Sequence, residues 1–160
     1  MIKKSSTIFL QVVIVALGIL ALVLMIRFPL TEGRAVNLDL FRIYADPFII
    51  CGYLASIPFF VALYQTFKLL GYIKQNKVFS LNSVKALGTI KYCAIVLGIL
   101  IVMAGIYIRI FHAEGDDPAG FLATCIVTTF MSIVIATAAA VFEKTLQSAV
   151  DIKSENDLIV

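Results

Sequence analysis

Residues 8–26 read IFLQVVIVALGILALVLMI, nineteen residues interrupted by a single glutamine. At about 1.5 Å per residue, a helix of this length reaches roughly 28 Å, close to the hydrocarbon thickness of a bilayer. Lys3 and Lys4 precede the run, as in a signal peptide, but the run is too long for one and no small-residue cleavage motif precedes Arg27. The stretch therefore predicts an uncleaved transmembrane helix over residues 8–27.

Three further apolar runs predict three more spans, over residues 47–67, 92–110 and 121–142, followed by a tail over residues 143–160. The chain is 61% hydrophobic and 14% charged, whereas a soluble domain is about half apolar and about a quarter charged. Too little polar surface remains to coat a water-soluble core. The predicted fold is one all-α domain, residues 1–160, forming an integral membrane four-helix bundle.

The basic residues are divided between the two sides of this predicted domain. All nine lysines fall near the two termini or between the second and third spans, and all four arginines fall on the opposite side. Cytoplasmic segments of membrane proteins carry an excess of basic residues. We therefore expect both termini and the middle segment in the cytoplasm.

The segment between the second and third spans has the pattern of a short helix. Ser80 has the side chain of an N-cap, and Phe79 and Val84 occupy the positions of a hydrophobic staple. Apolar residues then recur at near-helical spacing, with Lys85 and Lys91 off that stripe. The pattern predicts a short amphipathic cytoplasmic helix that lies on the inner membrane face or runs directly into the third span.

The tail is expected to continue the fourth span into the cytoplasm. It ends with a polar turn and three apolar residues, which is unusual for a purely solvated tail. We expect this end to dock either on the protein's own helices or on a partner. The candidate partner-binding residues of the middle segment and tail are Phe79, Ser80, Lys85, Glu155, Asn156, Asp157 and Leu158.

Small residues at four-residue spacing predict faces on which membrane helices approach closely. The expected role is packing within one bundle, and the alternatives are a homo-oligomer seam or a wet, threonine-lined path. The candidate packing residues are Gly52, Ser56, Ala94, Gly98, Thr128, Ser132 and Ala136, with Thr124 and Ala140 extending the ladder of the fourth span.

No convincing catalytic set is present in the sequence. The predicted spans hold no Asp, Glu, Lys or His at mid-depth, which an intramembrane enzyme or a proton-driven pump would usually need. His112, Glu114, Asp116 and Asp117 gather in the outer segment, where a cation site is the alternative to a solvated acidic loop. We predict no metal, because ligands on a glycine-containing loop are not preorganised, and no cofactor, enzyme activity or direct nucleic-acid binding.

Three stretches, in order, resemble a known family over nearly the whole chain. They are PFFVALYQTFKLL (58–70), NKVFSLNSVKAL (76–87) and the closing ENDLIV (155–160). Together they resemble the bacterial membrane family Domain of Unknown Function 2975, although that family more often has Thr where Ile159 stands. The resemblance implies four spans in the bacterial cytoplasmic membrane. It also implies a gene that often neighbours a small helix-turn-helix regulator of the Cro type.

These observations favour a non-enzymatic membrane regulator or sensor that communicates with a cytoplasmic partner. The resemblance suggests a helix-turn-helix transcription regulator as that partner. The alternative is a small transporter, channel or drug-resistance component with a cavity between spans two to four. A structural accessory subunit is the third hypothesis.

Overall fold

The computed structural model describes residues 4–31, 44–111 and 118–158. The secondary structure of these residues is helical, as predicted. The helices are α1 (Lys4–Thr31), α3 (Pro47–Lys74), α4 (Leu81–Phe111) and α5 (Ala119–Leu158). Each of the four is long and apolar enough to cross a membrane, which confirms the four predicted spans.

Two helices run well beyond their predicted spans. α4 has 31 residues and α5 has 40, which correspond to about 46 Å and 60 Å of helix. A hydrocarbon core is about 30 Å thick, so both helices project beyond it. In place of a separate amphipathic helix between spans two and three, the structure shows the first turns of α4, which continue unbroken into the third span.

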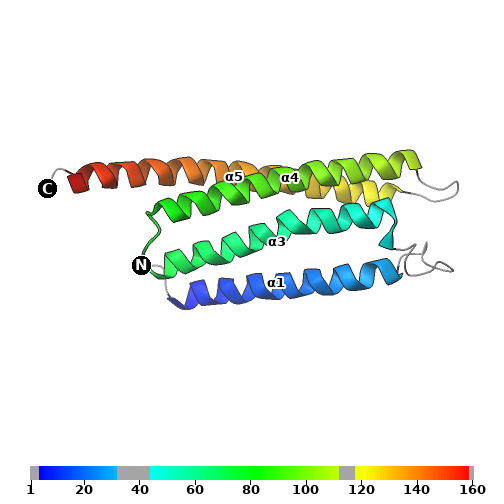
Figure 1. Ribbon diagram of the computed structural model, residues 1–160, viewed down its shortest axis with the longest axis horizontal. Helices are drawn as coiled ribbons and strands as arrows, with labels where there is room; N and C mark the ends of the chain where they lie inside the picture. Colours follow the sequence, from blue (N-terminus) through cyan, green and yellow to red (C-terminus); the bar gives the residue numbers. More distant parts are fainter. Residues whose placement is uncertain (1–3, 32–43, 112–117, 159–160) are drawn as a thin grey trace.

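The helices alternate in direction, so both ends of the described chain lie at the same end of the molecule, beside the connection from α3 to α4 (Figure 1). We call this the lysine-rich end. Its described lysines are Lys4, Lys68, Lys74, Lys77, Lys85, Lys91, Lys144 and Lys153.

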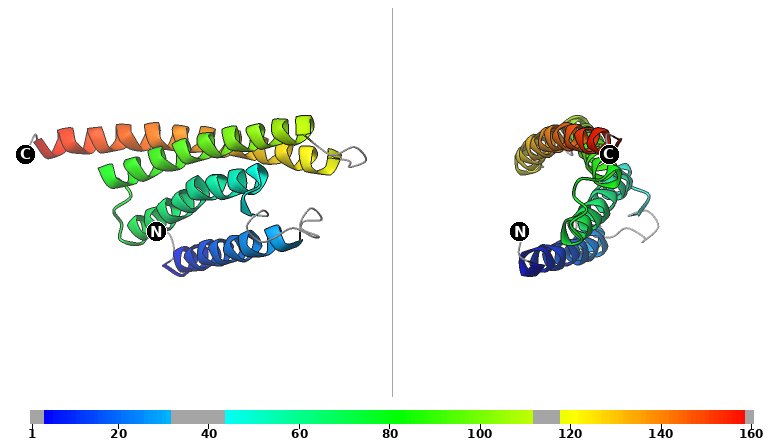
Figure 2. Two further views of the ribbon diagram at one scale, coloured as in Figure 1. Left: turned by 45° about the vertical axis from the view of Figure 1, so that its right-hand side comes forward. Right: turned by 90° about the vertical axis from the view of Figure 1, so that its left-hand side faces the viewer.

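The four helices form an open, curved row and not a closed bundle. Each packs mainly on its neighbours in sequence, most extensively α4 on α5 and least extensively α1 on α3. The end-on view in Figure 2 shows α1 and α5 at the two ends of the arc. Lipid tails are as apolar as the helices themselves, so no hydrophobic force drives α1 and α5 together to close the bundle.

Small residues allow α4 and α5 to approach closely. Gly98 and Gly105 are buried in α4. A Cβ atom built on Gly98 would lie 3.4 Å from Cβ of Ser132, and one on Gly105 would lie 3.5 Å from Cβ of Cys125. Larger side chains on α4 at these positions would therefore push the two helices apart.

The face of α5 that contacts α4 follows the predicted ladder only from Ser132 to Ala140. Most of its buried and half-buried residues recur at alternating steps of three and four: Leu122, Cys125, Thr129, Ser132, Ala136, Ala139, Glu143, Leu146 and Val150. This average of 3.5 residues is that of helices coiling around each other. Phe121, Ala140, Gln147 and Ala149 are also half-buried. A ladder with constant four-residue steps drifts by about 40° per step, and accordingly Thr124 and Thr128 are exposed.

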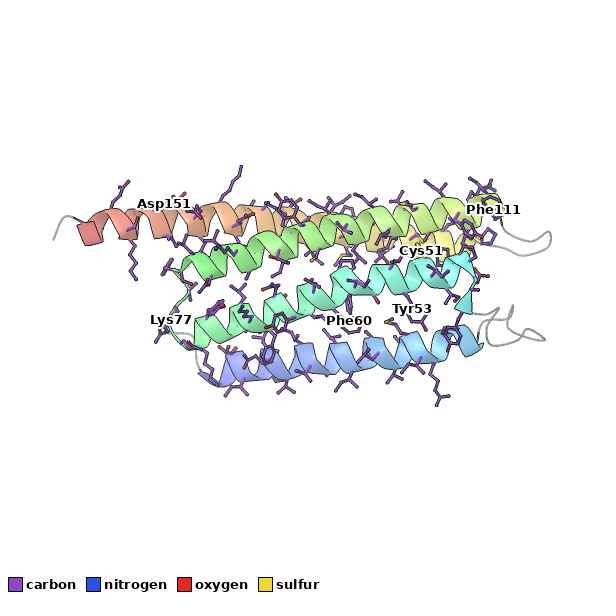
Figure 3. All side chains as sticks on the ribbon, in the orientation of Figure 1. Cys51, Tyr53, Phe60, Lys77, Phe111 and Asp151 are labelled. Carbon is purple, nitrogen blue, oxygen red and sulfur yellow. The ribbon has the colours of Figure 1, made fainter. Side chains whose placement is uncertain are left out.

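α1 is the most loosely attached helix. The apolar window of its span contains no buried residue. Tyr53 of α3 reaches it, with the hydroxyl donating a hydrogen bond to the carbonyl oxygen of Met25 at 3.2 Å. Figure 3 shows Tyr53 and Phe60 on the side of α3 that faces α1. The Tyr53 hydrogen bond is one of the contacts that hold α1 in the row.

The α4–α5 contact can be tested with two adjacent leucine substitutions in α5. Ser132 is 5% exposed and Ile133 is 58% exposed. Ser132→Leu should destabilise the protein by about 1–3 kcal/mol, the usual cost of overpacking, while Ile133→Leu should be nearly silent. Thermal unfolding in detergent measures both. Equal loss of stability in the two variants would show that Ser132 does not lie on a packing face.

Candidate functional site

The connection between α3 and α4 is a defined turn. Asn76 adopts a left-handed backbone conformation with φ 57°. Its N–H donates to the carbonyl oxygen of Ile73 at 3.1 Å, and the N–H of Lys77 donates to that of Tyr72 at 2.9 Å. This pair of bonds is a Schellman motif, and asparagine is one of the few residues that tolerate the left-handed position. The motif ends α3 and fixes the direction of the chain after it.

Two serine hydroxyls then tie the turn to the start of α4. The hydroxyls of Ser80 and Ser83 both donate to the carbonyl oxygen of Lys77, at 2.9 and 3.3 Å. Ser80 also accepts a hydrogen bond from the N–H of Ser83 at 3.4 Å, in the geometry of an N-cap. Ser83 is completely buried. The backbone of Lys77 is therefore held against α4 by two side chains.

The outer surface of this turn combines apolar and basic side chains. Phe79 is 58% exposed and Lys85 is exposed, whereas Val84 is buried. The two members of the expected hydrophobic staple thus differ sharply in exposure. Phe79 and Lys85 are available for contact with lipid or with a partner at the lysine-rich end.

An ion pair joins α4 to α5 near the same end. Nζ of Lys91 lies 2.6 Å from Oε2 of Glu143, and both side chains are only about a quarter exposed. A Cβ atom built on Gly88 would lie 2.8 Å from Oε1 of Glu143, so the carboxylate fills the space that this glycine leaves. Nζ of Lys91 also lies 4.6 Å from the centre of the Tyr92 ring. Charge and shape therefore both fix the position of Glu143.

This ion pair was not predicted from the sequence. Lys91 directly precedes the predicted third span and Glu143 directly follows the predicted fourth span. Consecutive spans are antiparallel, so these two positions lie at the same depth. Two opposite charges at the same depth were therefore the sequence signal from which the ion pair could have been predicted.

The α5 extension, residues 151–158, projects past the start of α4. Val150 is half-buried, whereas residues 151–156 are all exposed, among them the candidates Glu155 and Asn156. Asp157 and Leu158 belong to the helix backbone, but their side chains lie outside the described part of the structure. The tail is thus a helical rod, and its described side chains are solvent-accessible beyond Val150.

The predicted packing residues fall into two groups. Ala94, Gly98, Ser132 and Ala136 come together along the α4–α5 contact, where they also line one side groove. The other three, Gly52, Ser56 and Thr128, lie away from it: nothing lies within 4 Å of a Cβ built on Gly52, the Ser56 hydroxyl donates to the Tyr53 carbonyl within α3, and Thr128 is exposed.

Gly52 and Thr128 instead line a cavity of about 430 Å³, which we call the concave groove. Residues of all four helices contribute to it, so it lies inside the curve of the row, away from the lysine-rich end. Phe48 of α3 and Phe121 of α5 pack edge to face beside it, with ring centres 5.2 Å apart. The groove is the structural counterpart of the cavity expected between spans two to four.

The outer acidic cluster of His112, Glu114, Asp116 and Asp117 lies outside the described residues. Within residues 4–31, 44–111 and 118–158, no three His, Cys, Asp or Glu side chains gather in a way that would hold a metal ion.

The ion pair predicts a measurable coupling between Lys91 and Glu143. Glu143→Gln and Lys91→Met should each lower the melting temperature by a few degrees, because each leaves its former partner's charge half-buried and unpaired. The double variant should lose less than the sum of the two single losses. Thermal unfolding of all four proteins in one detergent tests this. Additive losses would mean that the two side chains do not interact in the folded protein.

Comparison with known proteins agrees with the membrane fold. The model of the family described as "Protein of unknown function (DUF2975)" matches residues 30–160. The uncharacterized membrane protein YoaS of Bacillus subtilis (strain 168) is 45% identical over 161 residues, which cover 99% of each chain. No solved structure matches. The chain therefore belongs to the DUF2975 family of membrane proteins.

Proposed function

We propose that this protein is a non-enzymatic regulator or sensor in the bacterial cytoplasmic membrane, and that its lysine-rich end faces the cytoplasm and binds a soluble partner. The family resemblance suggests a small helix-turn-helix transcription regulator as that partner. The observation that carries the proposal is the α5 extension, which stays helical through Leu158 although residues 151–156 contact nothing that buries them.

The length of the extension supports a role outside the bilayer. Gly88 lies against Glu143 and Gly98 lies against Ser132, so in this antiparallel pair Leu81 lies level with residues 149 and 150. Eight further residues of α5, about 12 Å of helix, therefore project beyond the start of α4. Packing among the membrane helices does not require them.

The turn beside the extension supports a specific surface. Its backbone is held by the Asn76 turn and by Ser80 and Ser83. Phe79 and Lys85 are exposed next to it. A partner would therefore meet an ordered surface with one large aromatic side chain and several lysines. Aromatic side chains are common anchors of interfaces, and charges set orientation and encounter rate.

A small transporter or channel is the second candidate, and the concave groove favours it. However, none of the described residues that line the groove is charged, which weighs against coupling to an ion gradient. A transporter also has no need of an exposed helix beyond the membrane. The two candidates thus place the functional site at opposite ends of the molecule.

The orientation can be tested with single cysteines in a protein lacking Cys51, Cys93 and Cys125. Asn82→Cys lies at the lysine-rich end, and Asn37→Cys lies in the opposite connection, outside the described residues. A membrane-impermeant maleimide on intact cells should label the Asn37→Cys protein and spare the Asn82→Cys protein, because the lysines should face the cytoplasm. Both proteins should react after the cells are opened. Outside labelling of Asn82→Cys would reverse the orientation.

The tail can be tested by removing residues 154–160. Folding and insertion should be unchanged, because the deletion begins beyond the last half-buried residue, Val150. Capture of the proposed helix-turn-helix partner should be abolished, and expression of that regulator's targets should change. Affinity capture and transcript measurements report the two effects.

A protein with residues 154–160 in permuted order is the matched control, since it keeps the length and charge of the tail. It should fail in capture like the truncated protein if the order of residues is recognised. Wild-type capture and target expression in a folded, truncated protein would exclude the regulator hypothesis in this form. The groove-based candidate would then be favoured.

A further inference from the structure

We propose that the concave groove holds one hydrocarbon chain of a phospholipid, from the leaflet opposite the lysine-rich end. This site is separate from the surface proposed to bind a partner. The groove also stands apart from the side grooves along α4 and α5, because all four helices line it.

The position of the groove matches one leaflet. Its α3 lining residues fall between Phe48 and Ala55, in the first turns of that helix. Eight residues of helix span about 12 Å, and half of the hydrocarbon core is about 15 Å. A chain that lies parallel to the helices would therefore occupy the groove over most of one leaflet's depth.

The chemistry of the lining suits methylene groups and excludes a headgroup. Among the residues that the structure describes, no Asp, Glu, Lys or Arg contributes to it. The hydroxyl groups that line it already donate within the protein: Thr124 to the Gly120 carbonyl at 3.0 Å, Thr128 to the Thr124 carbonyl at 2.7 Å, and Tyr53 to the Met25 carbonyl at 3.2 Å. A ligand would find no free hydroxyl donor there, so contact with an apolar chain is the interaction that remains.

The groove is continuous with the surface that faces the bilayer. Gly52, Thr124 and Thr128 line it and are exposed on the membrane helices, so a chain can enter sideways without crossing the protein. A helix from a second copy is the competing occupant, and the oligomeric state in detergent distinguishes it from a lipid chain.

Gly52 offers a way to fill the groove without disturbing the fold. Nothing lies within 4 Å of a Cβ built on Gly52, so Gly52→Leu places a side chain directly in the open space. Gly71 is the matched control, because it lies in the same helix, also has nothing within 4 Å of its Cβ position, and lines neither the concave groove nor a side groove along α4 and α5. Both substitutions replace a helix-interior glycine and should raise helix propensity similarly.

The experiment is native mass spectrometry of the full-length protein in detergent with added phosphatidylcholine. The headgroup of this lipid has no net charge, so it binds only weakly to the lysines at the other end of the molecule. The wild-type and Gly71→Leu proteins should each retain one lipid. The lipid occupancy of the Gly52→Leu protein should be lower by roughly tenfold or more. A tenfold loss corresponds to lost contact with about two methylene groups. Phosphatidylglycerol should give the same difference between the variants.

Two outcomes would overturn the proposal. One is equal lipid retention by Gly52→Leu and Gly71→Leu, and the other is a change in oligomeric state with Gly52→Leu alone, which would assign the groove to a second copy. Circular dichroism and melting temperature establish that both variants fold. Capture of the helix-turn-helix partner should be unchanged in Gly52→Leu, so failure of this proposal is distinct from failure of the proposed function.

Discussion

The close approach of α4 and α5 is the contact on which the rest of the molecule depends. In lipid, helices gain little from hiding apolar surface, so association relies on dense packing and on internal polar contacts. This pair has both, with glycines at positions 98 and 105 against small side chains, and Lys91 against Glu143 at one end. α3 packs on α4, and α1 packs mainly on α3. The packing is therefore most extensive between α4 and α5, less extensive between α3 and α4, and least extensive between α1 and α3.

The sequence was sufficient to predict the four membrane helices. The reason is that a span must supply about twenty apolar residues and satisfy its backbone internally. The N-cap was also recognisable, because Ser80 directly precedes a helical pattern and the capping geometry is local. Helix ends were predicted less well. The tail was expected to continue α5 but to end in a polar turn over residues 154–157, whereas the backbone there stays helical.

Contacts between helices were harder to predict, because they depend on how two helices coil around each other. The ladder through Thr124 and Thr128 assumed a straight face, whereas the contact follows steps of three and four. Gly52 looked like a packing residue, but nothing in the sequence states that its helix face opens on a groove. The open arrangement of the four helices could not be predicted from the sequence either. Four hydrophobic spans are compatible with a closed bundle or a row, and the weak packing of α1 decides between them.

α5 carries both proposed sites on one continuous helix. Residues between 121 and 128 line the concave groove and residues 151–158 project at the other end, so about 22 residues, or roughly 33 Å of helix, separate the two. A helix of this kind transmits a displacement only by moving as a whole against α4. The Lys91–Glu143 pair and the small-residue contact both resist sliding, since a shift would separate the charges and drive larger side chains against the glycines. Any communication between the groove and the tail therefore has to work against the α4–α5 contact that holds the protein together.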